Sequence, residues 1–289
     1  MKLKVCLLIL ISVITLSCRK HKKVVVISDV GPTEQVRPDA PSEEIKKDTI
    51  EIVDSLSLIA EWNNCGLPVI TNKASSQVLY RKGYILSYNK DTRLANWVAW
   101  HLTSEHTTGK FTRRGIPYMV DEEVKSTRQE LQDWDDSYGY DHGHMCPAGD
   151  NKWSRLAMEQ TFFLTNMCPQ NSRLNQETWE RLESKCRDWA NKYGDIYIIT
   201  GPIVKPNAKT MGENKVAIPS AFYKVVLCLH EKKALGFIYA NQDPKDMEKM
   251  EDHVVSIDYI EKQIGINFFS ALEPQLEAQL EHKSDFNQW

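Results

Sequence analysis

The chain of 289 residues contains no Cys-x-x-Cys pair, no internal repeat and no low-complexity array. The missing cysteine pair argues against a zinc knuckle and a thioredoxin-like redox site, since both use two closely spaced cysteines. The missing repeat argues against a stacked solenoid. With 42% hydrophobic and 26% charged residues, the composition is that of an ordinary globular protein of one large domain or two small ones.

An excess of positive charge is also missing. The 36 lysine and arginine residues face 39 aspartate and glutamate residues, so the net charge is −3. This balance argues against a protein that binds nucleic acid through its overall charge. It does not argue against an enzyme, which needs positive charge only around its site, and Arg113, Arg114, Lys152 and Arg187 can supply it locally.

The apolar run at the start of the chain, residues 5–16, is shorter than the roughly 20 residues that span a bilayer. Two lysines precede it and Cys18 follows it closely, which is the pattern of an export signal. We predict a signal peptide over residues 1–18. The cysteine resembles the acylation site of a bacterial lipoprotein, although Thr15 stands where leucine is usual. We therefore expect an exported protein with a lipid on Cys18 that anchors it to a membrane, facing the periplasm or the cell exterior. Simple secretion and an uncleaved anchor are the alternatives.

Residues 19–57 have the composition of a flexible tether, with a basic cluster, three prolines and little apolar periodicity. The folded domain is expected over residues 58–289. Its strands and helices predict an α+β fold. Strands are expected in 78–89, 97–102, 196–200 (ended by Gly201-Pro202), 221–230 and 235–240, and helices over 176–192, in the 252–264 region and near 274–281.

Five cysteines remain outside residues 1–18: Cys65, Cys146, Cys168, Cys186 and Cys228. Export permits disulfides, but an odd count leaves at least one thiol unpaired within a single chain. Cys146 and Cys168 each precede a proline in the two motif runs described next. A disulfide between them and two buried thiols are both consistent with the sequence.

The first motif run, residues 140–150, places His144 beside Gly143 and close to Asp141. Histidine suits a general base because its ordinary pKa lies near working pH. Asp141 or Asn166 is expected to orient or support it. The alternative for His144 is a structural histidine in the core.

The second motif run, residues 165–187, places Asn175, Trp179, Glu183 and Arg187 four residues apart. On an α-helix each such step drifts by only about 40°, so the four side chains share one slowly rotating stripe. The Asn175 amide oxygen is a hard ligand suited to Mg²⁺, or else an N-cap. Glu183 can reach back toward a metal-bound water, and Arg187 is expected to contact phosphate unless the two form an exposed i,i+4 ion pair. Trp179 is expected in the core.

A base, a hard-metal ligand and an arginine together predict a metal-dependent phosphodiester hydrolase. Three other hypotheses remain. In the first, the fold acts on another phosphate ester; in the second, it serves only as a nucleic-acid binding module on the cell surface; in the third, His142 and His144 form a zinc pair. The last lacks a third strong ligand at usable spacing.

These motifs resemble the DNA/RNA non-specific endonuclease family of ββα-metal nucleases. The resemblance rests on Asp141-His142-Gly143-His144, on Thr165-Asn166-Met167-Cys168-Pro169-Gln170, and on Asn175, Trp179, Glu183 and Arg187 at their spacing, and it extends over residues 75–283.

The resemblance implies a mixed β-sheet core with a ββα-metal finger. It implies His144 as general base, Asn175 as the sole direct protein ligand of Mg²⁺ (or Mn²⁺), and Glu183 as the holder of a metal-bound water. Arg114 matches the family's upstream arginine best, and it and Arg187 would contact phosphate. Asn166 would position the histidine or the substrate, and Asp141 would lie at the substrate. The expected substrates are DNA and/or RNA, bound by their backbone and cut to leave 5′-phosphate ends.

His142 departs from the family pattern, which has arginine before the glycine. Arginine is always charged and binds phosphate with two parallel hydrogen bonds, whereas histidine is shorter and mostly neutral at pH 7. We expect His142 to weaken phosphate binding and to favour activity at lower pH.

Overall fold

The computed structural model describes residues 53–135 and 138–289. The predicted signal peptide and all of the predicted tether except its last residues lie outside this range. Helix α1 (Ser55–Glu61) crosses the predicted boundary between residues 57 and 58, because Asp54 caps it by accepting hydrogen bonds from the backbone of Leu56 and Ser57. Among the described residues, no helix has the length and apolar character needed to cross a membrane.

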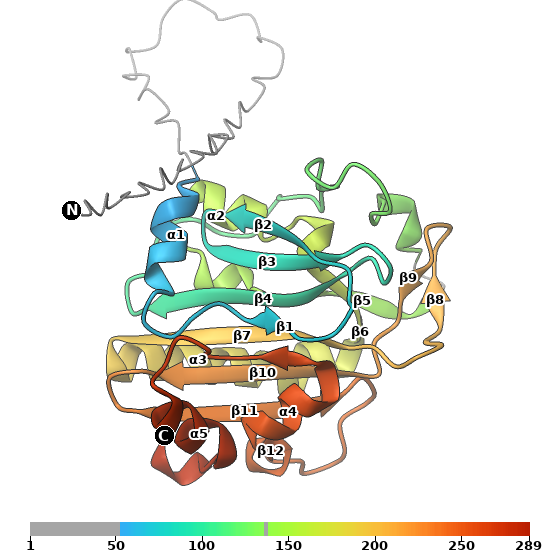
Figure 1. Ribbon diagram of the computed structural model, residues 1–289. Coiled ribbons are helices and arrows are strands. Elements are labelled where there is room, and N and C mark those ends of the chain that lie inside the picture. The colour runs from blue at the N-terminus through green and yellow to red at the C-terminus, as the bar shows by residue number, and fades with distance from the viewer. Residues whose placement is uncertain (1–52, 136–137) are drawn as a thin grey trace, which may run out of the picture. The chain divides into compact units, whose positions relative to one another are not determined.

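A seven-stranded sheet forms the centre of the domain, in the order β12-β11-β10-β7-β4-β3-β2, and every neighbouring pair in it is antiparallel (Figure 1). The α+β class is confirmed. The strands are β2 (Gln77–Arg81), β3 (Tyr84–Asn89), β4 (Leu94–Thr103), β7 (Asp195–Ile203), β10 (Ala221–Cys228), β11 (Lys233–Ala240) and β12 (Val254–Val255).

The sheet has an apolar core on each face. Along β7, Ile196 and Ile198 join one core while Tyr197 and Ile199 join the other, as the two-residue period of a strand requires. Helix α3 (Glu180–Tyr193) packs on the first face. Helices α1, α4 (Ile257–Ile264) and α5 (Pro274–His282) pack on the opposite face, in front of the sheet in Figure 1.

The predicted strand 196–200 continues through Gly201-Pro202 to Ile203, so the expected break there is wrong. The pairing of β7 with β4 stops at Thr200, and beyond it β7 pairs only with β10. At Pro202 the strand therefore has no neighbour on the β4 side, so proline, which lacks a backbone N–H, leaves no hydrogen bond to β4 unmade. Position 201 needs a glycine, because a Cβ there would lie only 2.5 Å from the Asn96 carbonyl oxygen.

The remaining elements surround the sheet. A separate hairpin pairs β5 (Tyr140–His144) with β6 (Met167–Asn171). The predicted helix 176–192 consists of a π-helical segment, Leu174–Trp179, followed by α3. The predicted helical region 252–264 begins with a 3-10 turn and β12 before α4. The shorter elements are α2 (Arg155–Gln160), β1 (Val69–Ile70), β8 (Thr210–Met211), β9 (Val216–Ala217) and β13 (Ile266–Asn267).

All five cysteines within the described residues are buried free thiols. Of the two arrangements considered for Cys146 and Cys168, the structure therefore has two buried thiols. Burial raises the pKa of both, which keeps them protonated.

Candidate active site

The β5–β6 hairpin and the helix that follows it bring the two motif runs together. His142 and His144 alternate with Gly143 on β5, so both histidines lie on one face of the hairpin. Gly143 faces Cys168 across the ladder, and a Cβ at this position would collide with the side chain of Gln170. The glycine is needed because the backbone of β5 passes directly over that side chain.

His144 has the geometry of a base with one nitrogen held and one open. Its Nε2 is buried without a hydrogen-bond partner among the described residues, and a hydrogen bond to the backbone of His142 engages the ring through its other nitrogen. Burial is the main cause that lowers the pKa of His144 to about 3, with the charges of Arg113 and His142 adding to the effect and the hydrogen bond to the His142 backbone opposing it. The imidazole is therefore neutral at pH 7 and has a lone pair on Nε2.

Asp141 orients Asn175. The Asn175 Nδ2 donates a hydrogen bond of 2.8 Å to Asp141 Oδ2, so the amide oxygen is the atom left for another partner. Burial alone would raise the pKa of Asp141, but hydrogen bonds from Ser172, Asn175 and Gln176 hold it below its ordinary value. The alternative that Asn175 is an N-cap is wrong, since the Leu174 N–H donates to Asn171 Oδ1 instead.

Glu183 lies on α3, eight residues after Asn175, and lines the same cavity. It is partly buried, and burial raises its pKa to about 7, with Asp150 adding to the effect and Lys224 and Arg187 opposing it. Lys224 is a buried cation on β10, with its Nζ 4.5 Å from the ring centroid of Trp179. Trp179 is fully buried, as predicted.

Arg187 does not form the exposed ion pair with Glu183 that was the alternative for this helix face. Its Nη1 lies 3.1 Å from Asp150 Oδ1, and its Nη2 donates to Ser184 Oγ at 2.8 Å. The Asp150 side chain is only 1% exposed, and Trp100 Nε1 donates to its second oxygen at 3.1 Å. Arg187 is thus held at the rim by a buried carboxylate.

Replacing Arg187 with methionine is expected to destabilise the protein by about 3–5 kcal/mol, because Asp150 would be left buried without its counter-charge. Burial already raises the pKa of Asp150, so the folded state binds a proton more readily than the unfolded state. The loss should therefore be larger at pH 8 than at pH 5. Urea denaturation at both pH values measures it.

The matched control is Arg173→Met, which removes an exposed i,i+4 partner of Glu177. It should change stability little, because exposed pairs contribute little. Equal losses in the two variants would contradict the buried-pair interpretation of Arg187.

His142 lies between two aromatic rings. Its ring stacks on Tyr118 at a centroid distance of 3.9 Å and 8°, and on Trp134 at 3.9 Å and 16°. Stacking between Tyr118 and Trp134 fixes the plane of the His142 ring and restricts rotation about its side-chain bonds. The arginine of the family pattern is thus replaced by a shorter imidazole whose orientation is set by packing.

Two predicted residues are placed differently from the rest. Arg114 is exposed and does not line the cavity, whereas Arg113 does, with its guanidinium 5.7 Å from the Phe162 ring. Asn166 is fully buried, and its side chain bonds the backbone of Cys146 and Thr161. Asn166 therefore fixes the chain that follows His144, through Cys146, and is not among the residues that line the cavity.

The other predicted residues line one cavity of about 710 Å³. Sequence reasoning named Arg113 only as a source of local charge and chose Arg114 for the phosphate contact. It missed four other residues as parts of this neighbourhood: Tyr118, Trp134, Asp150 and Lys224. Arg113 adjoins the residue that was chosen, and nothing in the spacing separates the two. The predicted residues that line the cavity are Asp141, His142, His144, Asn175, Glu183 and Arg187.

The donor set fits a hard divalent cation held by few protein ligands. The Asn175 amide oxygen is oriented by Asp141, Glu183 supplies a carboxylate nearby, and the unpartnered Nε2 of His144 lines the same cavity. The zinc hypothesis for His142 and His144 finds no support. Within residues 53–135 and 138–289, the one cluster of three His, Cys, Asp or Glu ligand atoms lies elsewhere, at Asp258, Glu261 and Glu281.

The comparison with known proteins agrees with this arrangement. A model of the DNA/RNA non-specific endonuclease family matches residues 67–275. The chain belongs to this family. The resemblance found in the motifs is thereby confirmed, and the family is one of metal-dependent nucleases.

Individual relatives show the same likeness. The chain is 36% identical over 211 residues to nuclease C1 of Cunninghamella echinulata, covering 68% of this chain and 83% of that protein. It is 32% identical over 225 residues to the mitochondrial nuclease EXOG of Danio rerio, covering 73% of this chain. The match spans 64% of that relative's length, so the chain covers somewhat less than two thirds of it.

A solved structure of the EndoG/EndoGI complex superimposes with a TM-score of 0.67 at 27% identity. The superposition covers 75% of this chain and 92% of that chain. The ββα-metal arrangement expected from the sequence is confirmed, with β5, β6 and the helix from Leu174 onward as its parts.

Proposed function

We propose that this non-specific endonuclease is exported, uses Mg²⁺, and hydrolyses the phosphodiester bonds of DNA and/or RNA to leave 5′-phosphate ends. One observation carries the proposal: His144 Nε2, buried and without a partner, lines the same cavity as an asparagine whose amide Asp141 orients. A base and a metal ligand held this way are the two groups that such hydrolysis requires.

In the proposed reaction, Nε2 of His144 accepts the proton of the attacking water, since the neutral ring has its lone pair there. Asn175 would hold the cation through its amide oxygen, and Glu183 would orient a water beside it. A Mg²⁺ ion held by these residues would supply charge stabilisation for the reacting phosphate. Arg113 takes the phosphate-contact role expected of Arg114, because Arg113 lines the cavity, and Arg187 contributes at the rim.

The test is digestion of plasmid DNA and of RNA by the chain without residues 1–18, with Mg²⁺ and with EDTA. Cleavage of both substrates that EDTA abolishes, with 5′-phosphate ends on the products, is the expected result. Binding of nucleic acid without cleavage from pH 5 to pH 9 would overturn the proposal in favour of the binding module.

The proposal of export rests on the N-terminal pattern, which lies outside the described residues, whereas six relatives carry "mitochondrial" in their names. We propose a lipid on Cys18. Fractionation of bacteria that express the full chain or Cys18→Ser tests this. Only the former should partition with membranes, and identical partitioning would contradict lipidation.

The residue at position 142 should set the pH dependence. His142→Arg is expected to raise kcat/KM at pH 8 several-fold and at pH 6 less, because arginine stays charged where histidine becomes neutral. Burial raises the pKa of Glu183 to about 7, so this carboxylate gains a proton on acidification both in the unsubstituted protein and in His142→Arg. Because that effect is common to both proteins, the ratio of their kcat/KM values at each pH reports on position 142 alone.

The measurement is a set of paired pH profiles at constant ionic strength. His142→Gln is the matched control, since it keeps a polar group without a charge that titrates. A ratio of His142→Arg to the unsubstituted protein that stays flat from pH 6 to pH 8 would refute the role of this histidine.

A further inference from the structure

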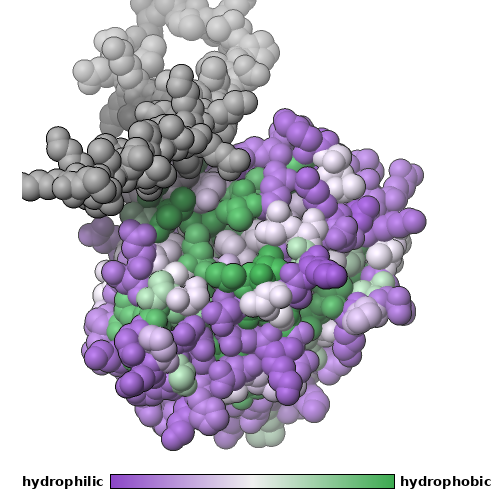
Figure 2. Space-filling view, in the orientation of Figure 1, coloured by the Kyte–Doolittle hydropathy of each residue, from purple (hydrophilic) through white to green (hydrophobic). Residues whose placement is uncertain are grey.

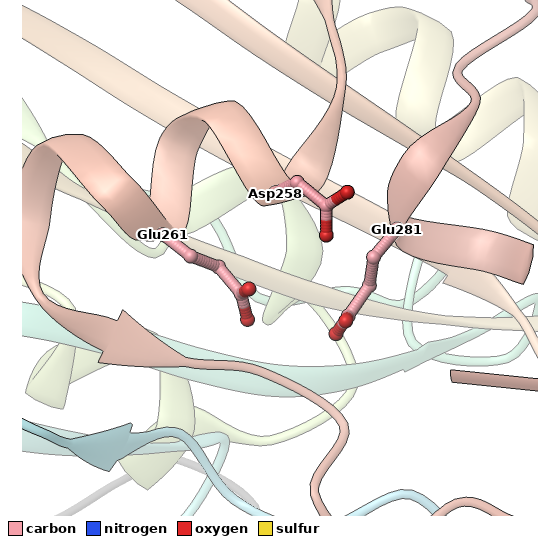
Figure 3. Close-up of side chains that lie close together, drawn as sticks. All are labelled: Asp258, Glu261 and Glu281. Carbon is pink, nitrogen blue, oxygen red and sulfur yellow. The ribbon is translucent and has the colours of Figure 1, made fainter. Parts of the chain in front are cut away.

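Three carboxyl groups meet between α4 and α5, on the face of the sheet opposite α3. Asp258 and Glu261 lie three residues apart on α4 and so share one side of that helix, and Glu281 comes from α5. One oxygen of each lies within 4.8 Å of the others. Figure 3 shows the three side chains converging on the space between the two helices.

Glu281 is the member that needs an explanation. The residue is 5% exposed, and its Oε1 is buried without a hydrogen-bond partner among the described residues. A buried carboxyl oxygen without a partner is costly, and glutamate is rarely buried unless it is paired. In Figure 3 this carboxyl is turned toward that of Glu261.

The positively charged side chains nearby do not neutralise the three carboxyl groups. Among the ion pairs of the described residues, one involves the cluster, between Asp258 and the exposed His282 at 3.3 Å. Glu261 accepts a hydrogen bond from the backbone of Phe268 at 2.6 Å. Burial and the neighbouring carboxylates raise the pKa of Glu281 to about 8 and that of Glu261 to about 7, with Glu277 contributing to both.

We propose that Asp258, Glu261 and Glu281 form a binding site for a calcium ion, separate from the catalytic metal site. Mg²⁺ usually binds through one or two carboxylates and keeps several waters, whereas Ca²⁺ takes about six to eight oxygen ligands and accepts several carboxylates. One oxygen of each of the three residues lies within 4.8 Å of the others, close enough for one ion to bind all three. Carboxylates are also the ligands that Ca²⁺ prefers, and Asp258 at the exposed side leaves room for the waters that complete its shell.

The ion would join α5 to α4, whose apolar side chains Ile260 and Leu280 belong to one core cluster and which are also linked by the exposed Asp258–His282 pair. It would give Glu281 Oε1 a partner and cancel the repulsion among the carboxylates. A ligand that binds only the folded state stabilises it in proportion to its saturation. The site therefore acts on stability, on the face of the sheet that does not carry the catalytic cavity.

The test uses the full chain with Asn175→Ala as the parent, so that the catalytic site contributes little metal binding. Its melting temperature is measured in EDTA, in millimolar Ca²⁺ and in millimolar Mg²⁺, and Ca²⁺ is titrated by calorimetry. Ca²⁺ is expected to raise the melting temperature by several degrees, and Mg²⁺ to raise it much less.

Adding Glu281→Gln gives a reversal that a general salt effect cannot produce. In EDTA the variant should melt at or above the parent, because a neutral amide replaces a carboxyl whose charged form is unfavourable at this position. In Ca²⁺ it should melt below the parent, because the site has lost a ligand. Glu213→Gln, at an exposed glutamate in the β8–β9 turn, should keep the full Ca²⁺ response.

Asp258→Asn changes an exposed ligand, so it should fold normally and still weaken the response. Three results would overturn the proposal: no Ca²⁺ response in the parent, a response that survives Glu281→Gln and Asp258→Asn, or an equal response to Mg²⁺. In the first case the carboxyls simply share protons.

Discussion

Replacing His144 with alanine is expected to lower kcat for DNA and RNA cleavage by about 10²–10⁴-fold, the usual contribution of a general base. The reason is the single unpartnered nitrogen, Nε2, which no other described side chain of the cavity replaces. KM should change little, because the ring is not expected to hold the substrate in the ground state. Steady-state cleavage of a short fluorescent duplex with saturating Mg²⁺ measures both constants.

The control for His144→Ala is His230→Ala, at a partly exposed histidine near the β10–β11 turn. It should leave cleavage unchanged. Since His144 is buried, melting temperatures of both variants must accompany the kinetics. A folded His144→Ala protein that keeps activity within about tenfold of the original would remove His144 from the role of base.

Replacing Asn175 with alanine is expected to raise the Mg²⁺ concentration needed for half-maximal activity by at least about 100-fold. Even residues that only support a ligand typically cost 10–100-fold in metal affinity or activity. The geometry gives the reason, since Asp141 takes the amide nitrogen of Asn175 and leaves its oxygen for the cation. Activity titrated against Mg²⁺ measures the shift.

Gln176→Ala is the matched control for Asn175→Ala. Gln176 is the next residue, is exposed, and also donates to Asp141 Oδ2, at 2.9 Å. It should shift the Mg²⁺ requirement far less than Asn175→Ala does. Similar shifts for the two variants would mean that Asp141, rather than the asparagine oxygen, carries the effect.

The sequence predicted the elements whose pattern is local. The β10–β11 pair, the position of α5 and the burial of Trp179 all follow from apolar periodicity and turn residues, and all are confirmed. The break expected at Gly201-Pro202 is wrong because the cost of proline depends on which neighbouring strand is present at that point. That information is long-range, so no window of sequence contains it.

For the site, the sequence supplied the residue types and the structure supplied the partners. Whether Asn175 caps a helix or faces a cation depends on Asn171 and Asp141, which lie on different elements. The pairing of Arg187 with Asp150 joins residues 37 apart. The choice between Arg113 and Arg114 depends on the path of a loop without regular structure, where adjacent side chains point in different directions.

The π-helical segment Leu174–Trp179 affects the relative angle of Asn175 and Glu183, the two residues proposed to hold the metal and its water. Successive residues on an α-helix are about 100° apart, so Asn175 and Glu183, eight residues apart, would diverge by about 80° on an uninterrupted one. A π turn holds one more residue per hydrogen-bonded loop, which winds the chain less and reduces that divergence. Conversion of the segment to regular α-helix of the same length would restore the divergence of about 80° and swing the asparagine away from the carboxylate, while every residue of the motif remained in the sequence. The spacing of these motifs therefore encodes an angle as well as an order.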